Sequence, residues 1–95
     1  MEGEPLAPQD AKELIRRIMA EDSLIFTKHA YDEMRNDNLA DTDVVNVLRA
    51  GRIYGPAEMV RGTWRYRVET PRIVVVIAFQ SATELRVVTA WRLKS

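Results

Sequence analysis

The spacing of the apolar residues changes at Gly51, and this change limits the fold more than any other feature of the sequence. Before Gly51, apolar side chains recur every three or four residues, which is the period of an amphipathic helix. After Gly51 they alternate with polar residues or form a short β-branched run, which is typical of strands. Helices followed by strands predict a two-layer α+β domain, with two to three N-terminal helices packed on a four-stranded antiparallel meander.

Three helices are predicted in the first half, with Ser23–Phe26 as a connection. The first should cover residues 10–21, the second should end near residue 36 and the third near residue 50. Each begins at a residue that can cap free backbone N–H groups. The expected caps are Asp10 with Glu13 in a capping box, Thr27, and Asp41 or Thr42. Gly51 should be the left-handed residue that often follows a helix.

The four strands are expected over residues 52–60, 63–69, 73–79 and 84–92. Gly55 and Pro56 interrupt the first, which makes it an edge strand. The wholly apolar run Ile73–Phe79 predicts a central strand covered on both faces. Alternation turns one set of side chains towards the core: Trp64, Tyr66, Val68, Leu85, Val87, Thr89 and Trp91. It turns the other set away from it: Arg65, Arg67, Arg86, Val88, Ala90 and Arg92.

Length and composition exclude several classes of protein. Ninety-five residues predict one domain, over residues 10–95, preceded by a flexible tail over residues 1–9. The absence of cysteine excludes disulfides, thiol catalysis and cysteine-ligated zinc. There is no glycine-rich phosphate loop and no metal-ligand spacing, so we expect neither metal nor cofactor. The longest apolar run is too short to cross a membrane and no signal pattern is present, so a cytoplasmic protein is expected.

The formal net charge of zero conceals a strong segregation of charge. Residues 1–48 hold eleven acidic and five basic side chains, whereas residues 49–95 hold nine basic and three acidic ones. Eleven of the fourteen bases are arginine, whose planar fork matches phosphate oxygens. The helical layer should therefore be acidic and one face of the sheet cationic. Such a face suits a polyanion or a charged partner.

Metal-independent RNA cleavage needs an acid, a base and cations around the phosphate. His29 is the single histidine and can serve as the acid or base. Arg65, Arg67 and Arg92 can hold the phosphate, and Tyr66 can donate a proton or stack on a base. The structural alternatives are that His29 only packs or caps at a helix end, and that the arginines form a solvated face or neutralise the acidic helices.

The order of several motifs resembles a small bacterial family, the domain of unknown function 4258, over about residues 24–92. The matching segments are Phe26-Thr-Lys-His29-Ala, Leu39 to Gly51, Gly62 to Val68, Ile73 to Ile77, and Val88-Thr89-Ala-Trp91. His29 matches the family's histidine and Thr89 a threonine near its end. Arg35 stands where an arginine often follows the histidine helix, although the usual acidic-arginine-glycine turn is replaced by Arg35-Asn36-Asp37-Asn38.

That family is similar to the RelE, MqsR and BrnT toxins, which are mRNA endonucleases neutralised by an adjacently encoded antitoxin. The resemblance implies a RelE-like fold, metal-independent cleavage of mRNA, free or on the ribosome, and an antitoxin partner. The leading hypothesis is thus a toxin-like endoribonuclease of a type II toxin–antitoxin system. Its expected RNA-contacting residues, besides those already assigned to cleavage, are Lys28, Arg35, Arg86 and Thr89.

Two non-enzymatic hypotheses remain. The arginine-rich face can belong to a non-catalytic module that binds RNA or an acidic protein segment. Alternatively, the chain is an oligomerisation domain in which Trp64, Tyr66 and Trp91 form the surface between two copies.

Overall fold

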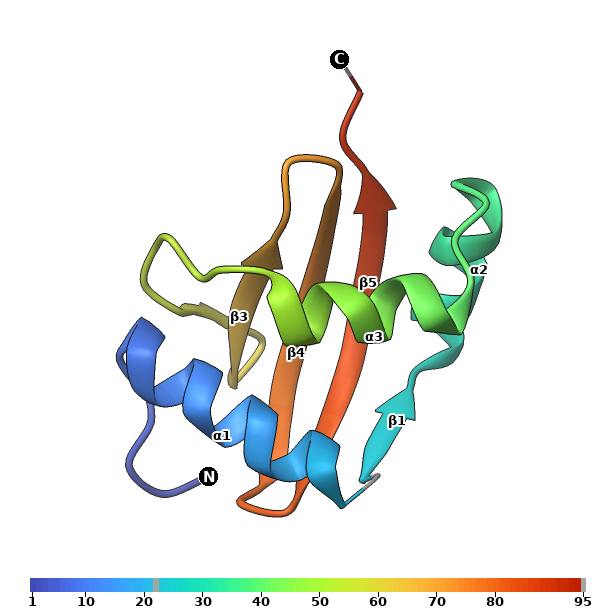
Figure 1. Cartoon of the computed structure of the whole chain (residues 1–95). Helices are drawn as coiled ribbons and strands as arrows, with labels where there is room; N and C mark the ends of the chain where they lie inside the picture. Colours follow the sequence, from blue (N-terminus) through green and yellow to red (C-terminus); the bar gives the residue numbers. More distant parts are fainter. Residues whose placement is uncertain (22, 95) are drawn as a thin grey trace.

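The computed structural model describes residues 1–21 and 23–94, and it contains helices packed on one mixed sheet (Figure 1). The helices are α1 (Pro8–Ala20), α2 (Lys28–Asn36) and α3 (Asp41–Ala50). The strands are β1 (Leu24–Phe26), β2 (Glu58–Val60), β3 (Thr63–Glu69), β4 (Ile73–Ser81) and β5 (Glu84–Arg92). The two-layer α+β architecture is confirmed.

The predicted four-stranded antiparallel meander is wrong, because the sheet has five strands in the order β1-β5-β4-β3-β2. The additional strand, β1, lies in the segment expected to be a connection. It pairs in parallel with β5, with Leu24 opposite Leu85 and Phe26 opposite Val87. Three residues are too few to show a strand period, so this strand forms through hydrogen bonds and packing with partners 61 residues further along the chain.

The helices begin differently from the prediction in two of three cases. Pro8 starts α1 two residues early, since its fixed φ suits the first helical turn, and the expected Asp10–Glu13 cap is absent. Thr27 caps α2 as predicted, its Oγ1 accepting from the Ala30 N–H at 3.0 Å. The N-cap of α3 is Ala40, whose N–H donates to the Asp43 carboxylate at 2.8 Å, so neither expected cap is used.

Gly51 is needed for close packing rather than for a left-handed backbone, because its φ is −72°. A Cβ at this position would lie 2.6 Å from the Val47 carbonyl oxygen and 2.9 Å from the Glu69 carbonyl oxygen. The next residue, Arg52, exchanges two backbone hydrogen bonds of 2.8 Å with Glu69. The strand expected over residues 52–60 is thereby reduced to this bridge and to β2, with the Gly55-Pro56 segment between them.

All three helices contribute to one core against the inner face of the sheet (Figure 1). Its largest fully buried side chains are Tyr66, Ile15, Met34, Leu48, Ile77 and Leu85. In β3 the predicted alternation is confirmed: Tyr66 and Val68 are buried in this core, and Trp64 packs against it, while Arg67 is exposed on the outer face. No described helix is long and apolar enough to cross a membrane.

A β-bulge at Val88 reverses the expected alternation in the second half of β5. Ile77 pairs with Val87, but the next residue of β4, Val76, pairs with Thr89, so Val88 is an extra residue. Beyond it, Ala90 is buried in the core, and Thr89 and Trp91 turn to the outer face. The prediction that Thr89 and Trp91 face the core and Ala90 faces outwards is therefore wrong.

Candidate functional site

The outer face of the sheet carries no helix within the described part of the chain, and its side chains form cross-strand rows. One row contains Glu69, Val74 and Trp91, from β3, β4 and β5 respectively. The adjacent row contains Arg67, Val76 and Thr89. Charged groups thus stand on β3, an aromatic ring on β5, and small apolar side chains on β4 between them.

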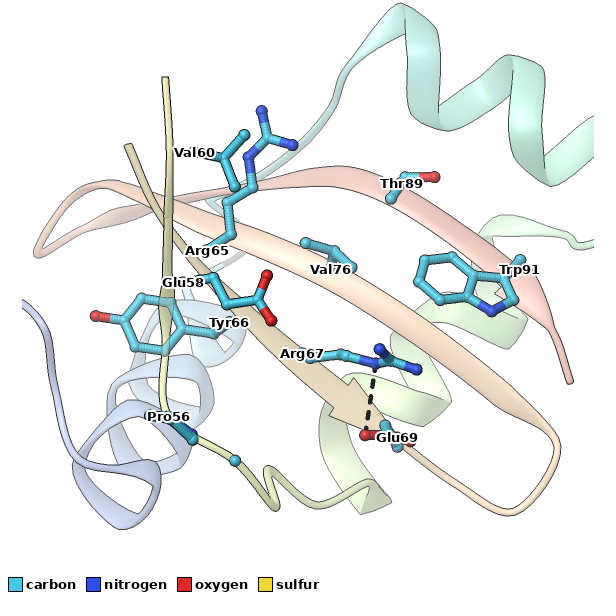
Figure 2. A pocket seen from close by; sticks show the side chains of 11 residues that line it. Pro56, Glu58, Val60, Arg65, Tyr66, Arg67, Glu69, Val76, Thr89 and Trp91 are labelled. Atoms are coloured by element: carbon cyan, nitrogen blue, oxygen red, sulfur yellow. Dashed lines mark ion pairs between the residues drawn. The ribbon is translucent and has the colours of Figure 1, made fainter. Parts of the chain in front are cut away.

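These rows form a groove of about 450 Å³ between the Gly55-Pro56 loop and β5 (Figure 2). We call this the arginine groove. Its lining residues are Gly55, Pro56, Glu58, Val60, Arg65, Tyr66, Arg67, Glu69, Val76, Thr89 and Trp91. The groove therefore combines two guanidinium groups, two carboxylates and one indole on an apolar floor.

Arg67 is held between a carboxylate and the indole of Trp91. Its Nε lies 3.6 Å from Glu69 Oε2, and its guanidinium carbon lies 5.3 Å from the centre of the Trp91 ring. The side chain of Arg67 is nevertheless 53% exposed. An ion pair on Nε and a cation–π contact on the flat face leave the two terminal nitrogens able to donate to an anion.

Arg65 and Glu58 face each other across β3 and β2 at the other side of the arginine groove. The Nε of Arg65 is buried and has no hydrogen-bond partner among the described residues. A buried donor without a partner costs about 1–3 kcal/mol, which an arriving acceptor would recover. Glu58 is exposed and makes no ion pair within the described chain.

Tyr66 contributes to the wall of the groove, but its hydroxyl group points away from the arginines (Figure 2). The hydroxyl donates to Glu4 Oε2 at 2.8 Å and accepts from the Leu6 N–H at 3.0 Å. Burial, helped by the Glu4 carboxylate, raises the pKa of Tyr66 to about 12. The structure therefore does not bring this hydroxyl together with Arg65 and Arg67, and it ties residues 4–6, expected in a flexible tail, to the core.

The candidates on α2 lie outside the arginine groove. His29 and Lys28 are exposed in the first turn of the helix, and neither lines the groove. Arg35 is exposed near the end of α2, with Nη1 4.0 Å from Asp32 Oδ1. The sequence-based grouping of His29 with Arg65 and Arg67 is thus not present in the structure.

Arg86 and Arg92 were expected on the outer face with the other arginines, and only Arg86 lies there. Arg86 pairs with Ala78 next to β1 and makes an ion pair with Glu84 at 3.6 Å, outside the groove. Arg92 instead binds the end of α2: Nε donates to the Asp37 carbonyl at 2.9 Å and Nη2 to the Asn38 carbonyl at 3.1 Å. The bulge at Val88 explains this orientation of Arg92, because after the bulge Arg92 points to the same side of the sheet as the buried Ala90.

Sequence reasoning did not assign a site role to Trp91, Glu58 or Glu69. The two carboxylates carried a signal, since they are two of only three acidic residues after residue 48. Trp91 carried no such signal, because simple alternation along its strand placed it in the core. The three aromatics Trp64, Tyr66 and Trp91 do not share one surface, which removes the surface assumed for an oligomerisation domain. Within residues 1–21 and 23–94, no group of three His, Cys, Asp or Glu residues could hold a metal ion.

Comparison with known proteins identifies one family. The model of a domain of unknown function (DUF4258) matches residues 26–92. This match runs from the last residue of β1 to the last residue of β5, and it includes the strands that form the arginine groove. No curated protein and no solved structure matches the chain.

Proposed function

The chain belongs to the DUF4258 family of domains, and from that premise we propose that it binds single-stranded RNA in the arginine groove. The observation that carries this proposal is the position of Arg67, which Glu69 and Trp91 hold while its terminal nitrogens make no hydrogen bond among the described residues. A preoriented guanidinium binds phosphate oxygens well, and an aromatic ring next to it provides a surface on which a base can stack. The arginine groove offers the guanidinium of Arg67 and the indole of Trp91 in two adjacent cross-strand rows.

A single strand fits this groove better than a duplex does. Bases can stack on Trp91 and lie over Val76 only when they are not paired inside a helix. The apolar floor supplied by β4 also suits the faces of bases rather than a row of phosphates. An acidic protein segment would satisfy Arg65 and Arg67 but would leave the indole and this floor without a matching group.

Cleavage of the bound RNA, as in toxin-like endoribonucleases, is the second candidate function. It is supported by Glu69, whose carboxylate lies beside the guanidinium of Arg67. A carboxylate next to an arginine can accept the proton of a 2′-hydroxyl as that oxygen bonds to phosphorus, while the arginine stabilises the phosphate. The P–O5′ bond breaks, and the leaving 5′-oxygen takes a proton from water. His29, the histidine expected to perform this proton transfer, lies outside the groove.

Fluorescence anisotropy with a labelled single-stranded hexaribonucleotide tests the binding proposal. Arg67→Ala should weaken binding by about tenfold or more, because a charge-assisted contact is worth roughly 1.5–3 kcal/mol. Arg16→Ala is the matched control, since Arg16 is exposed on α1 in the helical layer and should leave affinity almost unchanged. Equal loss from both substitutions would indicate diffuse charge attraction and would contradict a groove.

A cleavage assay with the same oligonucleotide, with and without ribosomes, tests the second function. If the chain cleaves RNA, Glu69→Gln should remove cleavage while His29→Ala retains it, and unregulated expression should arrest growth. Binding without cleavage, together with harmless expression, would leave RNA binding as the function and exclude the endoribonuclease.

A further inference from the structure

We propose that Glu58 makes the arginine groove selective for RNA that presents guanine. This inference rests on the proposed RNA binding and adds the base that the groove prefers. It is carried by the position of one carboxylate between two arginines and by the hydrogen-bonding chemistry that a carboxylate requires.

Glu58 stands opposite Arg65 in the pairing of β2 with β3. Figure 2 shows its carboxylate pointing into the groove, between the side chains of Arg65 and Arg67. Among the described residues it makes neither an ion pair nor a hydrogen bond, whereas the other carboxylate of the groove, Glu69, is paired with Arg67. Glu58 is therefore the carboxylate in the groove that a ligand can reach without displacing a partner.

An ionised carboxylate only accepts hydrogen bonds, so it repels phosphate oxygens. A ligand made of phosphates alone would gain from Arg65 and Arg67 and lose from Glu58. A ligand that presents donors at Glu58 and phosphate oxygens at the arginines satisfies all three groups. A nucleotide does this when its base carries N–H groups on the edge turned towards Glu58.

Guanine fits this requirement best among the four bases. Its N1–H and N2 amino group point the same way and can donate to both oxygens of one carboxylate. Adenine and cytosine offer one amino group beside a ring acceptor, and uracil offers one N–H between two carbonyl oxygens that a carboxylate repels. Such paired contacts discriminate between bases by about 1–3 kcal/mol, which is roughly five- to 150-fold in affinity.

The arrangement of the rows suits two neighbouring nucleotides. Glu58 lies on β2 and Trp91 on β5, three strand spacings of about 4.8 Å apart. Along the strands, the row of Arg67 separates the row of Glu58 and Arg65 from the row of Glu69 and Trp91. One base can stack on Trp91 while the next turns its edge to Glu58. The phosphate between them then lies over Arg67, which is on β3, one of the two strands between β2 and β5.

Binding to four labelled hexaribonucleotides tests this proposal: oligouridine, and the same strand with a central guanosine, inosine or adenosine. Inosine lacks only the N2 amino group of guanosine, so the pair isolates one donor. The intact chain should bind the guanosine strand about tenfold more tightly than the inosine strand. Glu58→Gln should abolish that difference and raise affinity for oligouridine, because it removes a carboxylate that repels phosphate oxygens. Glu84→Gln is the matched control, because Glu84 lies outside the groove and should retain the preference.

The possible results distinguish the guanine preference from the RNA binding on which it depends. Equal binding of guanosine and inosine strands, with oligouridine also bound, overturns guanine selectivity and leaves RNA binding intact. Retention of the preference by Glu58→Gln assigns it to another group and overturns the role of Glu58. Failure to bind any of the four strands overturns RNA binding itself. Circular dichroism melting of Glu58→Gln, with a midpoint equal to that of Glu84→Gln, ensures that a lost preference does not reflect unfolding.

Discussion

The guanidinium of Arg67 and the indole of Trp91 are in contact on the outer face of the sheet, 5.3 Å from guanidinium carbon to ring centre. The two residues come from β3 and β5, and β4 lies between these strands. Their contact depends on the bulge at Val88, since regular alternation along β5 would bury Trp91 in the core. The extra residue Val88 thus places Trp91 in the arginine groove beside Arg67.

Trp91→Ala should weaken binding of a single-stranded hexaribonucleotide by about five- to 150-fold, because stacking of one base on an aromatic ring contributes roughly 1–3 kcal/mol. Trp91→Phe should retain most of the affinity. Fluorescence anisotropy measures both. An alanine variant that binds like the intact chain would show that the indole does not contact the ligand.

Gly51→Ala should destabilise the fold by about 1–3 kcal/mol, because the new Cβ would lie 2.6 Å from the Val47 carbonyl oxygen and 2.9 Å from the Glu69 carbonyl oxygen. Gly55→Ala is the control, since its Cβ would meet nothing within 4 Å. Urea denaturation measures both free energies of unfolding. Equal stability of the two variants would contradict the close packing described for Gly51.

The pKa of Tyr66 predicts how stability depends on alkaline pH. Because burial raises it from 10 to about 12, the folded protein keeps its proton where the unfolded chain has lost it. The resulting stability is complete below pH 10 and should be lost as pH rises from 10 to 12. Urea denaturation across this range should show a steeper fall for the intact chain than for Tyr66→Phe.

At neutral pH, Tyr66→Phe should itself cost about 1–3 kcal/mol of unfolding free energy, because the Leu6 N–H and the Glu4 carboxylate lose a shared partner. Its affinity for RNA should not change, since the lost hydroxyl points away from the arginine groove. A large loss of affinity with unchanged stability would assign Tyr66 to the binding site.

Arg92→Ala should lower stability by about 0.5–1.5 kcal/mol while leaving affinity for RNA within about twofold, because the guanidinium binds the exposed Asp37 and Asn38 carbonyls instead of facing the groove. Thermal melting and anisotropy test the two effects separately. Arg92→Lys should recover little of the stability, because an ammonium group cannot reproduce the two directed contacts. Loss of affinity with unchanged melting would place Arg92 in the RNA site.

Local patterns determined much of this protein. The change of period at Gly51 predicted the helical and strand halves, and the alternation of Trp64 to Val68 predicted that Arg65 and Arg67 leave the core together. The Thr27 cap was also predictable, because a hydroxyl oxygen reaches an N–H three residues ahead within the same turn. Each of these features depends on the geometry of a few consecutive residues.

Only the tertiary structure decided what those local elements form together. Strand β1 exists because β5 offers it partners 61 residues away, and the bulge at Val88 follows from the pairing of β5 with β4. That bulge moved Trp91 into the arginine groove and turned Arg92 towards α2, whereas His29 remained outside. Hydrogen bonding and packing between distant segments choose among registers that a strand's own sequence permits equally. The sequence therefore determined which face is cationic, and the fold determined which residues share it.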